Sequence, residues 1–143
     1  MRFANLAKDY WELESGEELH ALHPDTFEIP PVEMRRALQR TDAVQLVFKI
    51  ALEDEDGHLR HIVERMWAVV TAVGDGYYLG RLINQPVSFD PGESEFYLGF
   101  GAEVPFRSEH VVATETPWRD ADVVRLLESA PLRYSWGGDT AEA

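Results

Sequence analysis

Apolar and polar positions alternate along residues 44–84, and two Asp-Gly dipeptides divide this stretch into three arms. Alternation with a period of two is typical of a half-buried strand, and Asp-Gly between apolar runs is the strongest local signal for a tight hairpin. The pattern therefore predicts a meander of two antiparallel hairpins, with Asp56-Gly57 and Asp75-Gly76 as two-residue type I′ turns.

The positions of these turns also predict which residues face each other across the strands. Around Asp56-Gly57 the expected pairs on one face are Leu46 with Trp67, Phe48 with Arg65, Ile50 with Val63 and Leu52 with His61. On the other face they are Val47 with Met66, Lys49 with Glu64, Ala51 with Ile62 and Glu53 with Arg60. Around Asp75-Gly76 they are Val73 with Tyr78, Ala72 with Leu79 and Val69 with Leu82. Two of these pairs join opposite charges, which favours the register, since a slip of one residue exchanges the faces.

The N-terminal residues 3–14 carry apolar side chains at helical spacing, which predicts an amphipathic helix that ends at Gly16. Four acids lie near or beyond its end: Glu12, Glu14, Glu17 and Glu18. Carboxylates at a helix C-terminus oppose the helix dipole, so this cluster is a candidate for contact with a partner. The alternative interpretation is a charged helix end exposed to water.

The segment from His20 to Pro31 is expected to be extended, because its prolines disfavour helix in the residues before them. Pro31 suits the first turn of a middle helix over residues 31–40. The side chains expected to point inward from this helix are Val32, Met34, Ala37 and Leu38.

After Asn84, prolines and glycines indicate loops around one or two short strands, the clearest over residues 103–106. Thr116-Pro117 starts a C-terminal helix expected over 117–129, and 138–143 form a tail. Together these elements predict one α+β domain over residues 1–143. We expect a strongly twisted, partly rolled antiparallel sheet of about four to six strands, with N-terminal, middle and C-terminal helices.

The net charge limits the classes of partner that the chain can bind. The chain has 26 Asp plus Glu against 13 Lys plus Arg, a formal net charge of −13, which repels nucleic acid and anionic membranes. Acids also interrupt the N-terminus, where a signal peptide needs an apolar region, and the chain contains no cysteine. We therefore expect a soluble cytoplasmic protein. The acids serve either solubility or a basic protein partner, and composition alone leaves both open.

Candidate chemistry is sparse. His58 and His61 flank the acids of the first turn, but strand residues three apart point to opposite faces, so no metal site is predicted. Gly99-Phe100-Gly101 lacks the context of a dinucleotide fingerprint, so no cofactor is predicted, and no residues form a catalytic signature. The alternative is a small-ligand or enzymatic pocket where Trp67, Arg81 and His110 converge, or a structural module.

Six segments occur in a characteristic order: HPDTFEIP at 23–30, MRRAL at 34–38, LVFKI at 46–50, ERMWAVVTAV at 64–73, GRLINQP at 80–86 and GAEVPF at 101–106. On these segments the chain resembles the bacterial domain-of-unknown-function family 2314. That family is similar to immunity protein family 33, whose members are predicted to protect a cell against a toxin made by its own kind. The resemblance covers residues 23–112, and it departs from the family pattern at Ala68, where valine is usual, and at Ala102, where aspartate is usual.

The resemblance implies a non-enzymatic protein that neutralises a cognate toxin by direct contact, and the acidic charge implies that the toxin domain is basic. The contact residues that we expect are acids and aromatics, because tight interfaces place aromatic anchors inside a charged rim. They are Glu12, Glu14, Glu17, Glu18, Asp54, Glu55, Asp56, Tyr77 and Tyr78.

Overall fold

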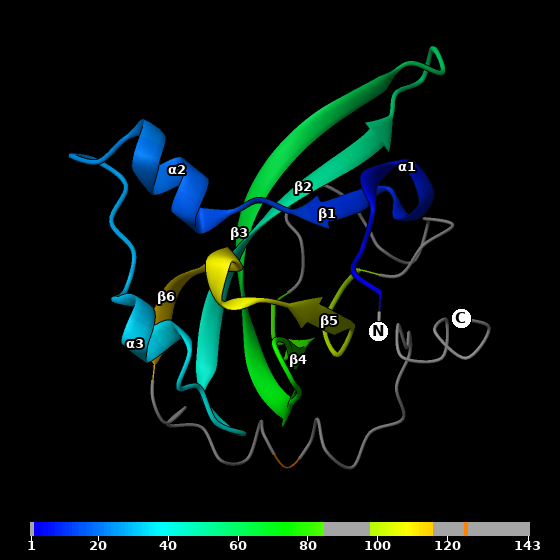
Figure 1. Ribbon diagram of the computed structural model, residues 1–143. Coiled ribbons are helices and arrows are strands. Elements are labelled where there is room, and N and C mark those ends of the chain that lie inside the picture. The colour runs from blue at the N-terminus through cyan, green and yellow to red at the C-terminus, as the bar shows by residue number, and fades with distance from the viewer. Residues whose placement is uncertain (1, 85–97, 116–124, 126–143) are drawn as a thin grey trace.

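Six antiparallel strands form one strongly curled sheet, accompanied by three short α-helices (Figure 1). This computed structural model describes residues 2–84, 98–115 and 125, and the counts refer to those residues. The strands follow the order β1-β2-β3-β4-β5, and β6 also pairs with β2. The predicted α+β class, with a rolled sheet of four to six strands, is confirmed.

The elements follow each other along the chain in a simple order. They are α1 (Leu6–Asp9), β1 (Trp11–Leu13), α2 (Gly16–Leu22), α3 (Val32–Arg35), β2 (Ala43–Glu53), β3 (Leu59–Val73), β4 (Tyr78–Leu82), β5 (Glu103–Phe106), the 3-10 turn η2 (Ser108–His110) and β6 (Val111–Glu115). Strands β1 and β6 share one edge of β2, because β1 pairs with Phe48–Ile50 and β6 with Ala43–Leu46. No helix among the described residues is long and apolar enough to span a bilayer.

The main core lies on one face of the sheet, where alternate residues of β2 and of the second half of β3 are buried. Its strand residues include Val44, Leu46, Phe48, Ile50, Met66, Ala68, Val70, Leu82, Val104 and Phe106. A smaller cluster on the other face joins Ala43 and Val69 to the half-buried Trp67, Ile83 and Phe100. Burial on both faces gives β2 its nearly continuous apolar character.

The register of the first hairpin is shifted by one residue from the predicted one. Leu46 faces Met66, Ile50 faces Ile62 and Glu53 faces Leu59. The cause is a three-residue loop, Glu55-Asp56-Gly57, in which only the glycine has a positive φ, 82°. This is the geometry of a turn followed by a glycine bulge, so the predicted type I′ turn is wrong. The predicted charge pairs Lys49–Glu64 and Glu53–Arg60 are wrong for the same reason.

The second hairpin follows the predicted register only near its turn. Val73 faces Tyr78 and Ala72 faces Leu79, as expected. A bulge at Thr71 then shifts the pairing, so Val69 faces Arg81 and its predicted partner Leu82 faces Ala68. Gly76 has a φ of 83° whereas Asp75 is not among the residues with positive φ, so this turn is not type I′ either.

The predicted helix over residues 3–14 is wrong in extent. Helix α1 has four residues and is capped by Tyr10, which adopts a left-handed φ of 66°, and the chain then continues as β1. Burial overrides the helical spacing, because Trp11 pairs with Ile50 and packs its ring 5.5 Å from that of Phe48.

Gly16 begins a helix instead of ending one. Ser15 precedes α2 and accepts a hydrogen bond on its Oγ from the backbone N–H of Glu18, which is the signature of an N-cap. The extended segment predicted from His20 is therefore wrong over 20–22, which belong to α2.

The middle helix is shorter than predicted, with four residues, and its inward face differs. Leu38 is buried as expected, but Met34 is 45% exposed and Ala37 is exposed. Arg35 is buried in their place, since its guanidinium finds three oxygen acceptors. Strand β5 matches its predicted bounds. Apart from Arg125, the predicted C-terminal helix at 117–129 and the tail at 138–143 lie outside the described residues.

Candidate functional site

The far half of the β2–β3 hairpin extends beyond its neighbours in the sheet. Strand β1 pairs with β2 only as far as Ile50, and β4 pairs with β3 only from Ala68 onward. We call residues 51–65 the hairpin arm. Its loop lies at the opposite end of the molecule from α3 and β4 (Figure 1).

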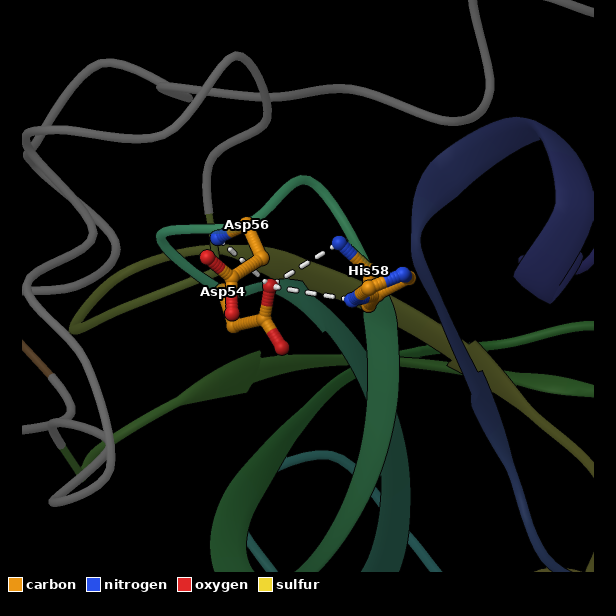
Figure 2. Close-up of side chains that lie close together, drawn as sticks. All are labelled: Asp54, Asp56 and His58. Carbon is orange, nitrogen blue, oxygen red and sulfur yellow. Dashed lines mark hydrogen bonds and ion pairs between the residues drawn. The ribbon is translucent and has the colours of Figure 1, made fainter.

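Four consecutive acids stand at the end of the hairpin arm, and we call them the acidic tip: Glu53, Asp54, Glu55 and Asp56. All four are exposed. Asp54 orders the loop, because its Oδ1 accepts hydrogen bonds of 2.9 Å from the backbone N–H groups of Asp56 and His58 (Figure 2). The Glu55 and Asp56 side chains are exposed to solvent, so the tip presents a strongly negative surface.

Asp54, Asp56 and His58 also offer possible metal ligands within 4.8 Å of one another. All three come from one exposed loop, and Asp54 Oδ1 already accepts hydrogen bonds from the loop backbone. A structural zinc site has four protein ligands and a calcium site six to eight oxygens, and this cluster offers three groups. The role of Asp54 in the turn accounts for the cluster.

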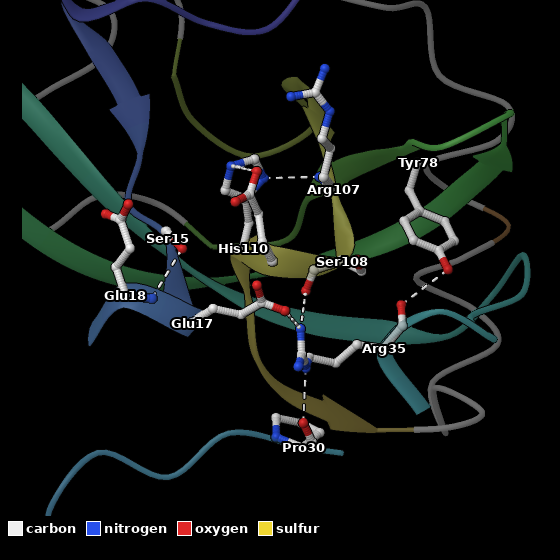
Figure 3. A network of polar contacts seen from close by, with 10 residues as sticks. Ser15, Glu17, Glu18, Pro30, Arg35, Tyr78, Arg107, Ser108 and His110 are labelled. Carbon is white, nitrogen blue, oxygen red and sulfur yellow. Dashed lines mark hydrogen bonds and ion pairs between the residues drawn. The ribbon is translucent and has the colours of Figure 1, made fainter. Parts of the chain in front are cut away.

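Arg35 joins four parts of the chain from a buried position (Figure 3). Its Nε donates to the Pro30 carbonyl at 2.8 Å, and its Nη1 donates to Glu17 Oε2 at 2.7 Å and to the Ser108 carbonyl at 3.0 Å. Its own carbonyl accepts from the Tyr78 hydroxyl at 3.0 Å. Arg35 therefore ties α2, α3, η2 and β4 together, which is a structural role.

His110 lies next to this network and is neutral at pH 7. Burial and, to a smaller extent, the nearby Arg107 charge lower the pKa of His110 to about 4, and Glu17 acts in the opposite direction. The His110 Nδ1 accepts a hydrogen bond of 2.9 Å from the Arg107 backbone N–H, so the ring proton belongs on Nε2. The imidazole thus acts as a fixed acceptor.

The three residues expected to line a pocket occupy different surroundings. Trp67 belongs to the small apolar cluster on one face of the sheet. Arg81 is buried and donates through Nε to the Gly101 carbonyl at 3.0 Å. His110 packs beside Phe3, with ring centroids 6.4 Å apart. Each side chain has a local packing or hydrogen-bonding role.

The predicted contact residues divide into exposed and structural ones. Among the acids of the first cluster, Glu12 accepts a hydrogen bond from the Leu6 N–H, Glu14 is half-buried, Glu17 pairs with Arg35 and Glu18 is exposed.

The two tyrosines face inward to different extents. The half-buried Tyr77 places its ring over Gly74, and Tyr78 is only 6% exposed, stacked on Phe106 at 5.2 Å. Of the predicted contact residues, the structure thus gathers on one exposed surface Asp54, Glu55 and Asp56, three of the four acids of the tip, far from α2 (Figure 1).

Sequence reasoning missed two features of this surface. Leu59 and Val63, on one face of the hairpin arm, are large apolar side chains that are 60% and 61% exposed. The buried Arg35 gave no signal, since arginine in a short helix is normally exposed.

Fold and site together define the chain as an α+β protein with a curled antiparallel sheet and a projecting acidic hairpin. No family model, no curated protein and no solved structure matches it. The resemblance to family 2314 therefore stays a prediction.

Proposed function

We propose that the chain is a non-enzymatic binding domain that neutralises a basic toxin domain by direct contact through its acidic tip. The observation that carries the proposal is the run of four exposed acids at the end of a projecting hairpin. A net charge of −13 adds a long-range attraction for a basic partner. The resemblance to immunity proteins supports the same role.

Electrostatic complementarity acts mainly on the association rate and on partner choice. Charges on a projecting tip meet an approaching partner before the rest of the surface does. Because exposed charges are screened over about 8 Å at physiological salt, the contribution of the tip should fall steeply as salt is added.

The test combines the purified chain with the product of the adjacent toxin-like gene and measures association rates at several salt concentrations. The double variant Glu55→Lys/Asp56→Lys is expected to slow association by about tenfold at low salt, and by less at high salt. The control Glu28→Lys/Glu33→Lys makes the same charge change at exposed positions away from the tip.

Two results would overturn the proposal. One is the absence of association between the two wild-type proteins, even at low salt. The other is an equal loss of rate in both double variants, which would show that net charge matters and the tip does not. A generic basic protein such as cytochrome c serves as the reference for non-specific attraction.

A further inference from the structure

The chain contains the dipeptide Asp-Gly twice, and both copies lie in exposed turns. Asp56-Gly57 lies in the loop between β2 and β3, and Asp75-Gly76 lies in the turn between β3 and β4. All four residues are exposed, and the φ angles of Gly57 and Gly76 are 82° and 83°. The dipeptide, its exposure and the glycine conformation are therefore the same at the two sites.

An aspartate that precedes a glycine can rearrange its main chain without an enzyme. The glycine amide nitrogen forms a bond to the aspartate carboxyl carbon and gives up its proton. One carboxyl oxygen leaves as water with that proton and one from solvent, and a five-membered succinimide remains. Water then opens the ring at the main-chain carbonyl, where the bond to nitrogen breaks and the nitrogen regains a proton. The product is isoaspartate, and glycine favours the attack because it has no Cβ to hinder it.

Hydrogen bonds hold the peptide groups on both sides of Asp56. The N–H groups of Asp56 and His58 both donate to Asp54 Oδ1 at 2.9 Å. The Gly57 N–H donates to the Asp54 carbonyl at 3.1 Å, and the Asp54 N–H donates to the His58 carbonyl at 2.8 Å. The attack requires the Gly57 nitrogen to rotate toward the Asp56 carboxyl carbon and to lose its proton. At least the bonds from the Asp56 and Gly57 N–H groups must therefore open first.

The peptide group between Asp75 and Gly76 is held less firmly. The Gly74 N–H donates to the Tyr77 carbonyl at 2.9 Å, and this bond lies outside the dipeptide. Within the part of the chain that the structure describes, the Gly76 N–H and the Asp75 carboxylate make no hydrogen bond or ion pair. No described atom lies within 4 Å of the place of a Cβ on Gly76. Rotation of this peptide group therefore breaks no hydrogen bond of the dipeptide.

We propose that Asp75 is a site of spontaneous isoaspartate formation, and that the hydrogen bonds to Asp54 protect Asp56 from the same reaction. Two hydrogen bonds of typical net strength that must open first slow the reaction about tenfold or more. The acidic tip thus keeps its carboxylates in place as the protein ages, whereas the β3–β4 turn changes. The proposal concerns the chemistry of the two turns and is independent of the proposed function.

Isoaspartate at position 75 lengthens the main chain of the β3–β4 turn by one carbon. The Tyr77 ring lies over Gly74 across this turn, and the Tyr78 hydroxyl donates to the Arg35 carbonyl at 3.0 Å. A longer turn shifts the start of β4 at the end of the molecule opposite the acidic tip (Figure 1). The new main-chain carboxylate is the acceptor for methyltransferases that act on isoaspartyl residues, so Asp75 is also a substrate site for this class of enzyme.

Ageing of the purified full chain, followed by trypsin digestion, tests the proposal. The digestion separates the two sites, because peptide 50–60 contains Asp56-Gly57 and peptide 66–81 contains Asp75-Gly76. After weeks at neutral pH, well below the melting temperature, peptide 66–81 should contain an isomer of unchanged mass. This isomer should form about tenfold or more faster than one in peptide 50–60. Ageing in water labelled with heavy oxygen should label it, and an isoaspartyl methyltransferase should methylate it. Equal rates for the two peptides, or a faster change in peptide 50–60, overturn the proposal.

Unfolding and two variants show whether the hydrogen bonds cause the difference. In guanidinium chloride the two peptides should form isoaspartate at similar rates. Asp54→Ala removes the side-chain acceptor and should speed the reaction in peptide 50–60 severalfold, with circular dichroism confirming the fold. Asp54→Asn keeps an acceptor oxygen and should stay near the wild-type rate. A difference between the peptides that persists in the unfolded chain overturns the proposal, as do equal rates for the two folded variants.

Discussion

Arg35 turns inward from a four-residue helix because three oxygen acceptors surround its guanidinium. The Pro30 carbonyl lies just before α3 and the Ser108 carbonyl lies in η2, far apart in the sequence. Glu17 adds a negative charge from α2. Without Arg35 these oxygens lose their charged donor. Leaving a buried acceptor without a hydrogen bond costs more free energy than a typical hydrogen bond contributes to stability.

We predict that Arg35→Ala lowers the free energy of unfolding by about 2–4 kcal/mol, because a buried charged donor is removed from its acceptors. Glu17→Gln should cost less than about 1 kcal/mol, since the Glu17 side chain is 45% exposed and its ion pair is screened by water. The exposed Glu18→Gln is the matched control on the same helix. Urea unfolding checks all three, and equal effects for Arg35→Ala and Glu17→Gln would contradict the network.

His110 makes the stability of the fold depend on pH. Its pKa is lowered from 6.5 to about 4 in the folded chain, so the unfolded state binds the proton first as pH falls. The contribution is complete above pH 6.5 and is lost between pH 6.5 and about 4, by up to about 3 kcal/mol. His110→Asn keeps an acceptor for the Arg107 N–H but does not titrate. Its free energy of unfolding should therefore fall less than that of the wild type between pH 7 and 5. Parallel pH profiles for the two proteins would contradict this assignment.

At the scale of elements, the start of α2 depends on a close contact with η2 and β6. A Cβ on Gly16 would lie 2.8 Å from Val112 Cγ1 and 3.3 Å from the carbonyls of Glu109 and Val111. Helix propensity favours alanine over glycine by up to about 1 kcal/mol, but crowding of this kind costs about 1–3 kcal/mol.

We therefore predict that Gly16→Ala destabilises the fold, with a net loss of about 1–2 kcal/mol measured by urea unfolding. Gly76→Ala provides a comparison in which strain comes from the backbone alone, because its φ is 83° and nothing lies near a Cβ there. An increase in stability for Gly16→Ala would show that α2 can move away from β6.

The sequence predicts the strands better than their register. Alternation identifies β2, β3 and β4, and β5 matches its bounds, because period-two patterns report local exposure directly. The one-residue error in the first hairpin comes from Gly57, which allows a three-residue loop where Asp-Gly also fits a two-residue one.

Two elements were beyond local patterns because distant contacts stabilise them. Trp11–Leu13 forms a strand only because β2 offers it an edge, and β6 adds to that same edge from far along the chain. The candidate site also combines a feature that is visible in the local sequence with one that depends on distant contacts. The acidic tip is visible as a run of acids, whereas the Arg35 network depends on segments that the fold brings together.

At the scale of the whole molecule, a net charge of −13 on one compact chain costs stability through self-repulsion. Added salt screens that repulsion, so we predict that the melting temperature rises by about 2–4 °C between 10 and 150 mM sodium chloride. Calorimetry checks the shift. A melting temperature that falls over this range would show that attractive ion pairs outweigh the excess of acids.

The account as a whole rests on the acidic tip as the surface that meets a partner. Backbone NMR spectra recorded during titration with the product of the adjacent toxin-like gene test this claim most directly. The account predicts that the largest changes in chemical shift fall on residues 53–58, and that they vanish for Glu55→Lys/Asp56→Lys. Changes centred on α2 or on the Arg35 network, with the loop unaffected, would contradict it.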